Sequence, residues 1–241
     1  MSTDPNVLQI NVQEDVKTGD VPPGTPAPTL KQIEENLPRE EVEKRQKIML
    51  EYTRLLSRYC EPHNKKSRWV TNADIPTVLA DGKDLVAMCN LPRGKYSSIG
   101  ALAHTQIEAN DPLRFFVFPN GMVVINPVIT SNTKVPVMKK EACMSFADNE
   151  IIPELPRYNK ITVTYQTLSR ADENSEPVLS KTITETFNGG VSHVYQHECG
   201  HLNGCNIYDT DYSPERSIGL GDGQPVDMAM WGEDVLQDEI K

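Results

Sequence analysis

Apolar residues recur every three or four positions in three stretches, which predicts three amphipathic helices. These stretches are Arg39–Tyr59, Asp74–Cys89 and Val191–Gly204. Asp74 stands where a helix cap is expected, and Pro76 suits the first helical turn. In the third stretch we expect the paired glycines at 189–190 to precede the helix, and Gly204 to end it.

Between the second and third helices the apolar period changes to two, which predicts strands. The expected strands are Phe115–Pro119, Met122–Asn126, Asn159–Gln166 and a less regular Val178–Phe187. The Asn120-Gly121 pair predicts a hairpin turn between the first two strands. Since strands come before the last helix and do not alternate with helices, the expected class is α+β, with antiparallel or mixed sheets packed around that helix.

The last helix carries the pattern H-E-x-x-H in His197, Glu198 and His201. Residues four apart share a helix face, so both imidazoles can bind one divalent metal ion. Glu198 then lies beside the first ligand, where it can take a proton from a water molecule that the metal activates. The pattern fixes few positions, and the same residues could also form a solvated helix face. A third ligand decides between these interpretations.

Several residues are candidates for the third ligand. A third histidine after a glycine is one known solution, but Ile207 occupies the position where it is needed. A downstream glutamate is another solution; Glu215 is very near in sequence, and Glu233 remains open as the ligand of a zinc endopeptidase. Cys143, within the sequence EACMS, is the stronger candidate.

Three segments in order resemble the motifs of the peptide deformylases. IGALAHTQ ends in Gln106, EACMS contains Cys143, and QHECGH spans residues 196–201. Pro156-Arg157 is similar to a further pair of that family, and the resemblance covers about residues 75–210. The chain departs from the motifs at several positions, including Ile99 and Ala101 in place of glycines, His104 and Ala142 in place of smaller residues, Met144 in place of Leu, and Gly200 in place of Asp.

This resemblance implies a metal-dependent hydrolase that removes the formyl group from N-formylmethionyl nascent peptides. It implies Cys143, His197 and His201 as ligands of Fe²⁺, with Zn²⁺, Ni²⁺ or Co²⁺ able to substitute. It implies Glu198 as the base, and the Gln106 amide and the Met144 backbone N–H as oxyanion donors. The expected methionine pocket is lined by His193 and Val194, which share the face of His197, and by the small residues Gly100 and Ala101.

Composition narrows the class of protein further. The chain has 241 residues and a net charge of −10, which disfavours direct DNA binding. Five cysteines at irregular spacing argue against a disulfide framework, and we interpret Cys60 and Cys89 as buried apolar residues. There is no apolar run long enough for a membrane span and no signal-peptide pattern, so we expect a cytoplasmic protein of a bacterial or phage-infected cell, with an organelle left open.

The expected organisation has four parts. A proline-rich arm covers residues 1–30 and includes an apolar patch at Val7–Val12, and a helical extension covers residues 31–70. The catalytic domain covers residues 71–210, and an acidic tail covers residues 211–241. The ribosome exit region is a candidate partner. A non-enzymatic alternative is a weakly active deformylase-like domain that binds nascent chains or ribosomes.

Overall fold

The structure is a computed structural model that describes residues 39–40, 66–90, 100–146, 152–172 and 174–219. These residues do not include the Val7–Val12 patch, Cys60 or Glu233. They include only the first two residues of the expected Arg39–Tyr59 helix. The described α-helices and strands are α3 (Ile75–Cys89), β1 (Leu102–Ala103), β2 (Phe115–Val117), β3 (Val123–Asn132), β4 (Pro136–Lys140), β5 (Glu154–Tyr158), β6 (Lys160–Gln166), β7 (Leu168–Ser169), β8 (Val178–Leu179), β9 (Ile183–Asn188), α4 (Gly189–Leu202) and α5 (Pro214–Ser217). Three short 3₁₀ helices cover Asn72–Asp74, His104–Gln106 and Met144–Phe146.

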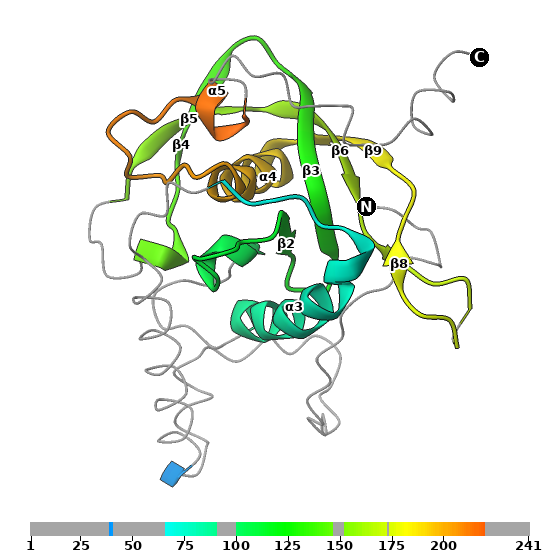
Figure 1. Cartoon of the computed structure of the whole chain (residues 1–241). Coiled ribbons are helices and arrows are strands. Elements are labelled where there is room, and N and C mark those ends of the chain that lie inside the picture. Colours follow the sequence, from blue (N-terminus) through cyan, green and yellow to red (C-terminus); the bar gives the residue numbers. More distant parts are fainter. Residues whose placement is uncertain (1–38, 41–65, 91–99, 147–151, 173, 220–241) are drawn as a thin grey trace, which may run out of the picture.

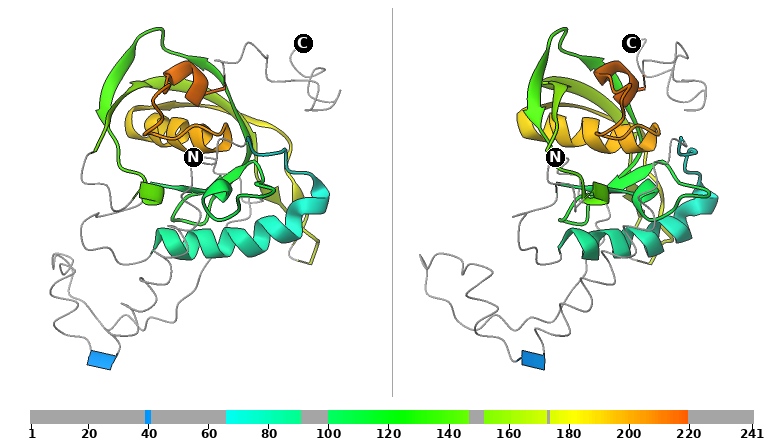
Figure 2. Two further views of the ribbon diagram at one scale, coloured as in Figure 1. Left: turned by 60° about the vertical axis from the view of Figure 1, so that its left-hand side comes forward. Right: turned by 90° about the vertical axis from the view of Figure 1, so that its left-hand side faces the viewer.

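The strands form one larger sheet and two small ones. The five-stranded sheet has the order β1-β2-β3-β6-β9, and all of its pairings are antiparallel. Strands β4 and β5 form a separate antiparallel pair, as do β7 and β8. Helix α4 lies in the middle of the described part, enclosed by strands and by α5, while α3 lies along the far side of β2 (Figures 1 and 2). The expected α+β class with a central helix is confirmed.

Strands β2 and β3 separate two apolar cores. Phe115 and Ile125 belong to the core that contains α3, whereas Phe116 and Val124 belong to the core that contains α4. Strand β2, and β3 as far as Ile129, are therefore buried on both faces, and the period of two distinguishes one core from the other rather than core from solvent. The predicted turn is present, with Gly121 at φ 83°, a left-handed conformation that favours glycine.

Helix α3 is confirmed from the residue after Asp74, with Val78 and Leu85 fully buried. Asp74 occupies the cap position, but its carboxylate does not cap this helix. It accepts hydrogen bonds from the Thr71 backbone N–H at 2.8 Å and from the Arg68 guanidinium at 2.9 and 3.1 Å. Asp74 thus fixes the chain that leads into α3.

The β4–β5 pair was not predicted from the sequence. Every residue from Val137 to Lys140 is exposed, so β4 lacks the alternation of a strand with one buried face. Pro136 and Pro156 also disfavour a strand assignment. The pair matters for the site because β4 leads directly into Glu141 and β5 carries Arg157 next to α4.

Helix α4 begins at Gly189, two residues earlier than predicted, and ends at Leu202. Gly204 follows at φ 71°, as expected for a glycine that ends a helix. Val191, the first residue of the stretch predicted to be helical, is exposed, whereas Tyr195, Cys199 and Leu202 form the buried face of α4. Within the part of the chain that the structure describes, no helix has the length and apolar character needed to cross a bilayer.

Candidate active site

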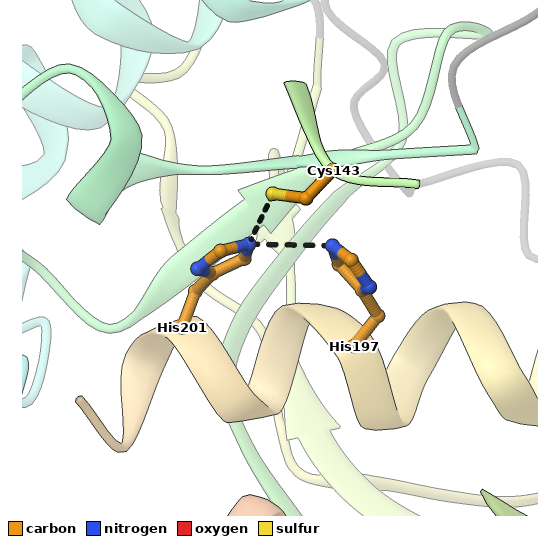
Figure 3. Close-up of side chains that lie close together, drawn as sticks. All are labelled: Cys143, His197 and His201. Carbon is orange, nitrogen blue, oxygen red and sulfur yellow. Dashed lines mark hydrogen bonds between the residues drawn. The ribbon is translucent and has the colours of Figure 1, made fainter. Parts of the chain in front are cut away.

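Cys143, His197 and His201 bring their ligand atoms together above one face of α4 (Figure 3). The Cys143 Sγ lies 3.2 Å from Nε2 of His201, and the two Nε2 atoms are 3.3 Å apart. In a tetrahedral site with ordinary Zn–N and Zn–S bonds, such donor atoms lie about 3.4–3.6 Å apart. The spacing and the sulfur–nitrogen donor set therefore fit a single transition-metal ion.

The electrostatics of this cluster favour a metal-binding thiolate. Burial alone would raise the pKa of the Cys143 thiol, but the imidazoles of His201 and His197 outweigh it and hold the pKa well below its ordinary value. A deprotonated sulfur is the form that binds metal. Cys143 is itself buried, at the end of the segment that follows β4.

Glu141 orients His197 from the side opposite the cluster. Its Oε2 atom lies 3.1 Å from His197 Nδ1, so that nitrogen can donate while Nε2 faces Cys143 and His201. The Arg157 guanidinium donates to both oxygens of Glu141, at 2.7 and 2.6 Å. Burial would raise the pKa of Glu141, but Arg157 and His197 lower it from 4.5 to about 2, which keeps the carboxylate charged.

Glu198 lies beside the cluster with no protein partner for one oxygen. The side chain is 3% exposed, and its Oε2 atom is buried without a hydrogen bond. Burial raises the pKa of Glu198 above its ordinary value, although the two histidines oppose this effect. A buried carboxylate with an unused oxygen is suited to hold a water molecule and accept its proton.

Gln106 reaches the cluster from the 3₁₀ helix that follows β1. Its carbonyl oxygen accepts from the Ala103 backbone N–H at 2.8 Å, which fixes the direction of the amide. The amide nitrogen then lies 4.0 Å from Cys143 Sγ and donates to Ser145 Oγ at 3.1 Å. A side-chain N–H is thus aimed at the space beside the thiolate.

A cavity of about 190 Å³ opens next to these groups. The four residues expected to form the pocket, Gly100, Ala101, His193 and Val194, all line it. The other lining residues include Gln106, Glu141, Cys143, Met144, His197 and Glu198. Gly100 packs closely on Val194, because a Cβ at Gly100 would lie 2.9 Å from a Val194 methyl group. The cavity is thus lined by the residues that the sequence singled out for the site, except His201, which lies behind it in contact with Cys143 and His197.

The sequence family model for polypeptide deformylase matches residues 64–216. The chain belongs to the polypeptide deformylase family. The peptide deformylase of Thermotoga neapolitana is 33% identical over 117 residues, which cover 47% of this chain and 62% of that enzyme. The peptide deformylase of Thermotoga maritima is 33% identical over 128 residues, covering 52% of this chain and 68% of that enzyme. The crystal structure of the Thermotoga maritima enzyme is 29% identical, covers 61% of this chain and 89% of that chain, and has a TM-score of 0.46.

The departures from the deformylase motifs are accommodated locally. His104 is buried, with Nε2 2.9 Å from Asp81 Oδ2, and its Nδ1 accepts from the Leu113 backbone N–H at 2.8 Å. It therefore links the segment before Gln106 to α3. Gly200 stands where the family motif has Asp, and the acidic partner of Arg157 in this chain is Glu141.

The sequence interpretation missed the role of Glu141 and of the residues around Arg157. One signal for Glu141 was available. It stands two residues before Cys143, and residues two apart in an extended segment point to the same side. Nothing local could identify Tyr212 and Ser217, whose hydroxyls both contact Arg157 from 55 and 60 residues away.

Proposed function

We propose that this chain is a metal-dependent peptide deformylase. It hydrolyses the formyl amide of N-formylmethionyl peptides and releases formate and a free amino terminus. One observation supports this most strongly: a cluster of the Cys143 thiolate and two imidazoles lies beside a cavity that is also lined by Glu198, with its unpartnered oxygen, and by Gln106. The family membership of the chain agrees with this chemistry.

In this proposal Cys143, His197 and His201 hold the metal ion. Fe²⁺ is the proposed natural ion, as the family resemblance implies, and Zn²⁺, Ni²⁺ or Co²⁺ can take its place. When bound, the ion supplies a Lewis acid that lowers the pKa of water and polarises the formyl group. Three protein ligands in a tetrahedral arrangement leave room for one further ligand, as is usual in catalytic sites.

Glu198 handles the proton in the reaction. It takes a proton from the attacking water and passes it to the nitrogen that leaves the formyl carbon. Its raised pKa suits both transfers, because a base with a pKa nearer to neutral can also act as an acid. The Gln106 amide N–H and the Met144 backbone N–H donate to the oxyanion that develops on the formyl oxygen.

The cavity beside the cluster receives the methionine side chain. Val194, Gly100 and Ala101 give it apolar walls, and His193 adds one imidazole. Burial lowers the pKa of His193, so this imidazole is neutral at physiological pH and is compatible with an uncharged substrate side chain. The proposed substrates are nascent chains, met near the ribosome exit region in the cytoplasm of a bacterial or phage-infected cell.

The catalytic unit is proposed to extend slightly beyond residues 71–210. Ser67 donates through both its backbone N–H and its hydroxyl to the Leu202 carbonyl at the end of α4, at 3.0 and 2.8 Å. Ser217 donates to the Gln196 carbonyl of the same helix at 3.0 Å. These contacts support residues 66–219 as one unit.

Formate release from formyl-Met-Ala-Ser tests the proposal. We expect release by the wild-type protein, loss after treatment with a chelator, and recovery on adding Fe²⁺ or Co²⁺. The unformylated peptide, incubated in parallel, should remain intact. Cleavage of internal peptide bonds without formate release would instead indicate the endopeptidase, and metal binding without either activity would indicate the weakly active binding domain.

A further inference from the structure

Arg157 is buried against α4, and it has contacts that no sequence motif predicts. The side chain is 1% exposed. Its Nε and Nη2 atoms donate to Glu141, while Nη1 donates to the Ser217 hydroxyl at 3.0 Å and to the Tyr212 hydroxyl. The guanidinium carbon of Arg157 also lies 5.3 Å from the centroid of the Tyr212 ring. Two hydroxyls thus hold the guanidinium on the side away from Glu141.

Gly200 leaves the space that the Ser217 hydroxyl occupies. A Cβ built at Gly200 would lie 3.0 Å from Ser217 Oγ, tighter than an ordinary contact, and 3.9 Å from Ser217 Cβ. The Ser217 hydroxyl also donates to the Gln196 carbonyl at 3.0 Å. The Ser217 hydroxyl therefore occupies space that a side chain at position 200 would need.

The contacts continue from these hydroxyls to the cluster. Ser217 and Tyr212 contact Arg157, Arg157 forms a two-point ion pair with Glu141, and Glu141 holds Nδ1 of His197. A planar guanidinium that bonds a carboxylate at two points fixes the orientation of that carboxylate. The orientation of the His197 ring thus depends on where the Arg157 guanidinium is held.

We propose that Ser217 and Tyr212 are positioning residues for the metal ligand His197, acting through Arg157 and Glu141. In this chain two hydroxyls, and no side chain from position 200, hold the guanidinium on the side away from Glu141. As a consequence α5, although it lies after the last sequence motif, is part of the metal centre. This inference rests on the metal centre of the proposed function.

The test measures zinc affinity on full-length protein that has been stripped of metal, by competition with a chromophoric chelator. Mutations of groups that orient a metal ligand typically weaken binding 10–100-fold. Glu141 is the group that orients the ligand, and Ser217 and Tyr212 act two steps further out, so we expect the low end of this range, about a 10-fold loss, for Ser217→Ala and for Tyr212→Phe. The two variants remove different hydroxyls, so each checks the other.

Ser67→Ala is the matched control. Like Ser217, Ser67 is a buried serine whose hydroxyl donates to a backbone carbonyl of α4, but it does not contact Arg157. We expect this variant to lose thermal stability like Ser217→Ala and to keep the zinc affinity of the wild type. If Ser67→Ala lost as much affinity as Ser217→Ala, the effect would be a general loosening of α4 and the inference would be wrong.

A rescue variant separates positioning from packing. In Ser217→Ala the atom nearest to a Cβ at position 200 is gone, and the Cys205 carbonyl oxygen remains at 3.4 Å. Gly200→Asp can then be added, so that its carboxylate reaches toward Arg157. We expect the double variant to recover zinc affinity to within a few-fold of the wild type. In Gly200→Asp alone the new Cβ lies 3.0 Å from the Ser217 hydroxyl, which must shift away from its place beside Arg157, and we expect this variant not to reach that affinity. Failure of the double variant to improve on Ser217→Ala would contradict the inference.

Cys143→Ala distinguishes this inference from the proposed function. If only Cys143→Ala weakens zinc binding, the metal centre stands and the roles of Ser217 and Tyr212 are refuted. If Cys143→Ala binds zinc as tightly as the wild type, the ligand assignment fails and the inference fails with it.

Discussion

A carboxylate oxygen of Glu141 lies 3.1 Å from Nδ1 of His197. This contact favours the tautomer in which Nδ1 carries the proton and donates it to Glu141. Nε2 then has its lone pair directed toward Cys143 and His201. The same carboxylate is fixed by Arg157. Glu141 therefore connects the β4–β5 pair to the metal helix.

Glu141→Gln should weaken metal binding by about 10–100-fold, because an amide holds the imidazole less strongly and cannot neutralise Arg157. Zinc affinity of the metal-stripped protein is the measurement. Glu154→Gln, an exposed glutamate on β5, is the control and should bind zinc like the wild type. Unchanged affinity in Glu141→Gln would mean that His197 is oriented by its own helix alone.

Cys143→Ala should abolish metal retention after dialysis, whereas Cys89→Ala and Cys205→Ala should retain the metal. All three cysteines are free and buried, but only Cys143 has its sulfur close to both histidines. Elemental analysis of each purified variant is the measurement. Full metal content in Cys143→Ala would rule out the sulfur as a ligand.

Removal of residues 1–30 should leave deformylation intact, because five prolines and few apolar residues give this segment little to bury. Removal of residues 1–70 should prevent stable folding. The Ser67 backbone N–H and hydroxyl bond to Leu202, and Val70 exchanges two hydrogen bonds with the Asn126 side chain. Circular dichroism and formate release compare the two truncations, and an active protein lacking residues 1–70 would show that these bonds are dispensable.

The Asp74–Arg68 pair should make stability depend on pH. The hydrogen bond from Arg68 lowers the pKa of Asp74 from 3.8 to about 2. A folded-state pKa below the unfolded value means that the carboxylate stabilises the fold fully above about pH 4 and loses this effect as the pH falls toward 2.

Asp74→Asn should therefore be less stable than the wild type near neutral pH, with a difference that shrinks below about pH 4. Urea unfolding at a series of pH values measures it. Asp84→Asn, at an exposed position on α3, is the control and should show no such trend. A difference between Asp74→Asn and wild type that stays constant down to about pH 3 would refute the ion-pair explanation.

The parts of the fold that the sequence predicts are those with a local signal. Helix α4 and the β2–β3 hairpin follow from apolar periodicity and from glycines at turns and ends, and the structure confirms both. The β4–β5 pair leaves no such signal, because its outer strand is exposed. Strand β4 is held by its hydrogen-bonded pairing with β5 rather than by burial of alternate side chains.

The candidate site divides in the same way. His197 and His201 are neighbours through helix geometry, and Cys143 follows from the motif resemblance. The partners of Arg157 come from two segments, one at Glu141 and one at residues 212–217, which packing around α4 brings together. Local periodicity carries no information about such contacts, which is why Ser217 and Tyr212 emerge only from the structure.

Glu198→Ala tests the central claim most directly, because this account makes Glu198 the base and not a ligand. The variant should retain its metal and lose about 10²–10⁴-fold in kcat for formate release from formyl-Met-Ala-Ser, with little change in KM. Glu198→Asp should recover little activity, since the shorter side chain withdraws the carboxylate from the water. Metal analysis and steady-state kinetics on the same preparation are the measurement: a metal-replete Glu198→Ala with impaired kcat agrees with the account, and a metal-replete variant with a kcat near that of the wild type would contradict it.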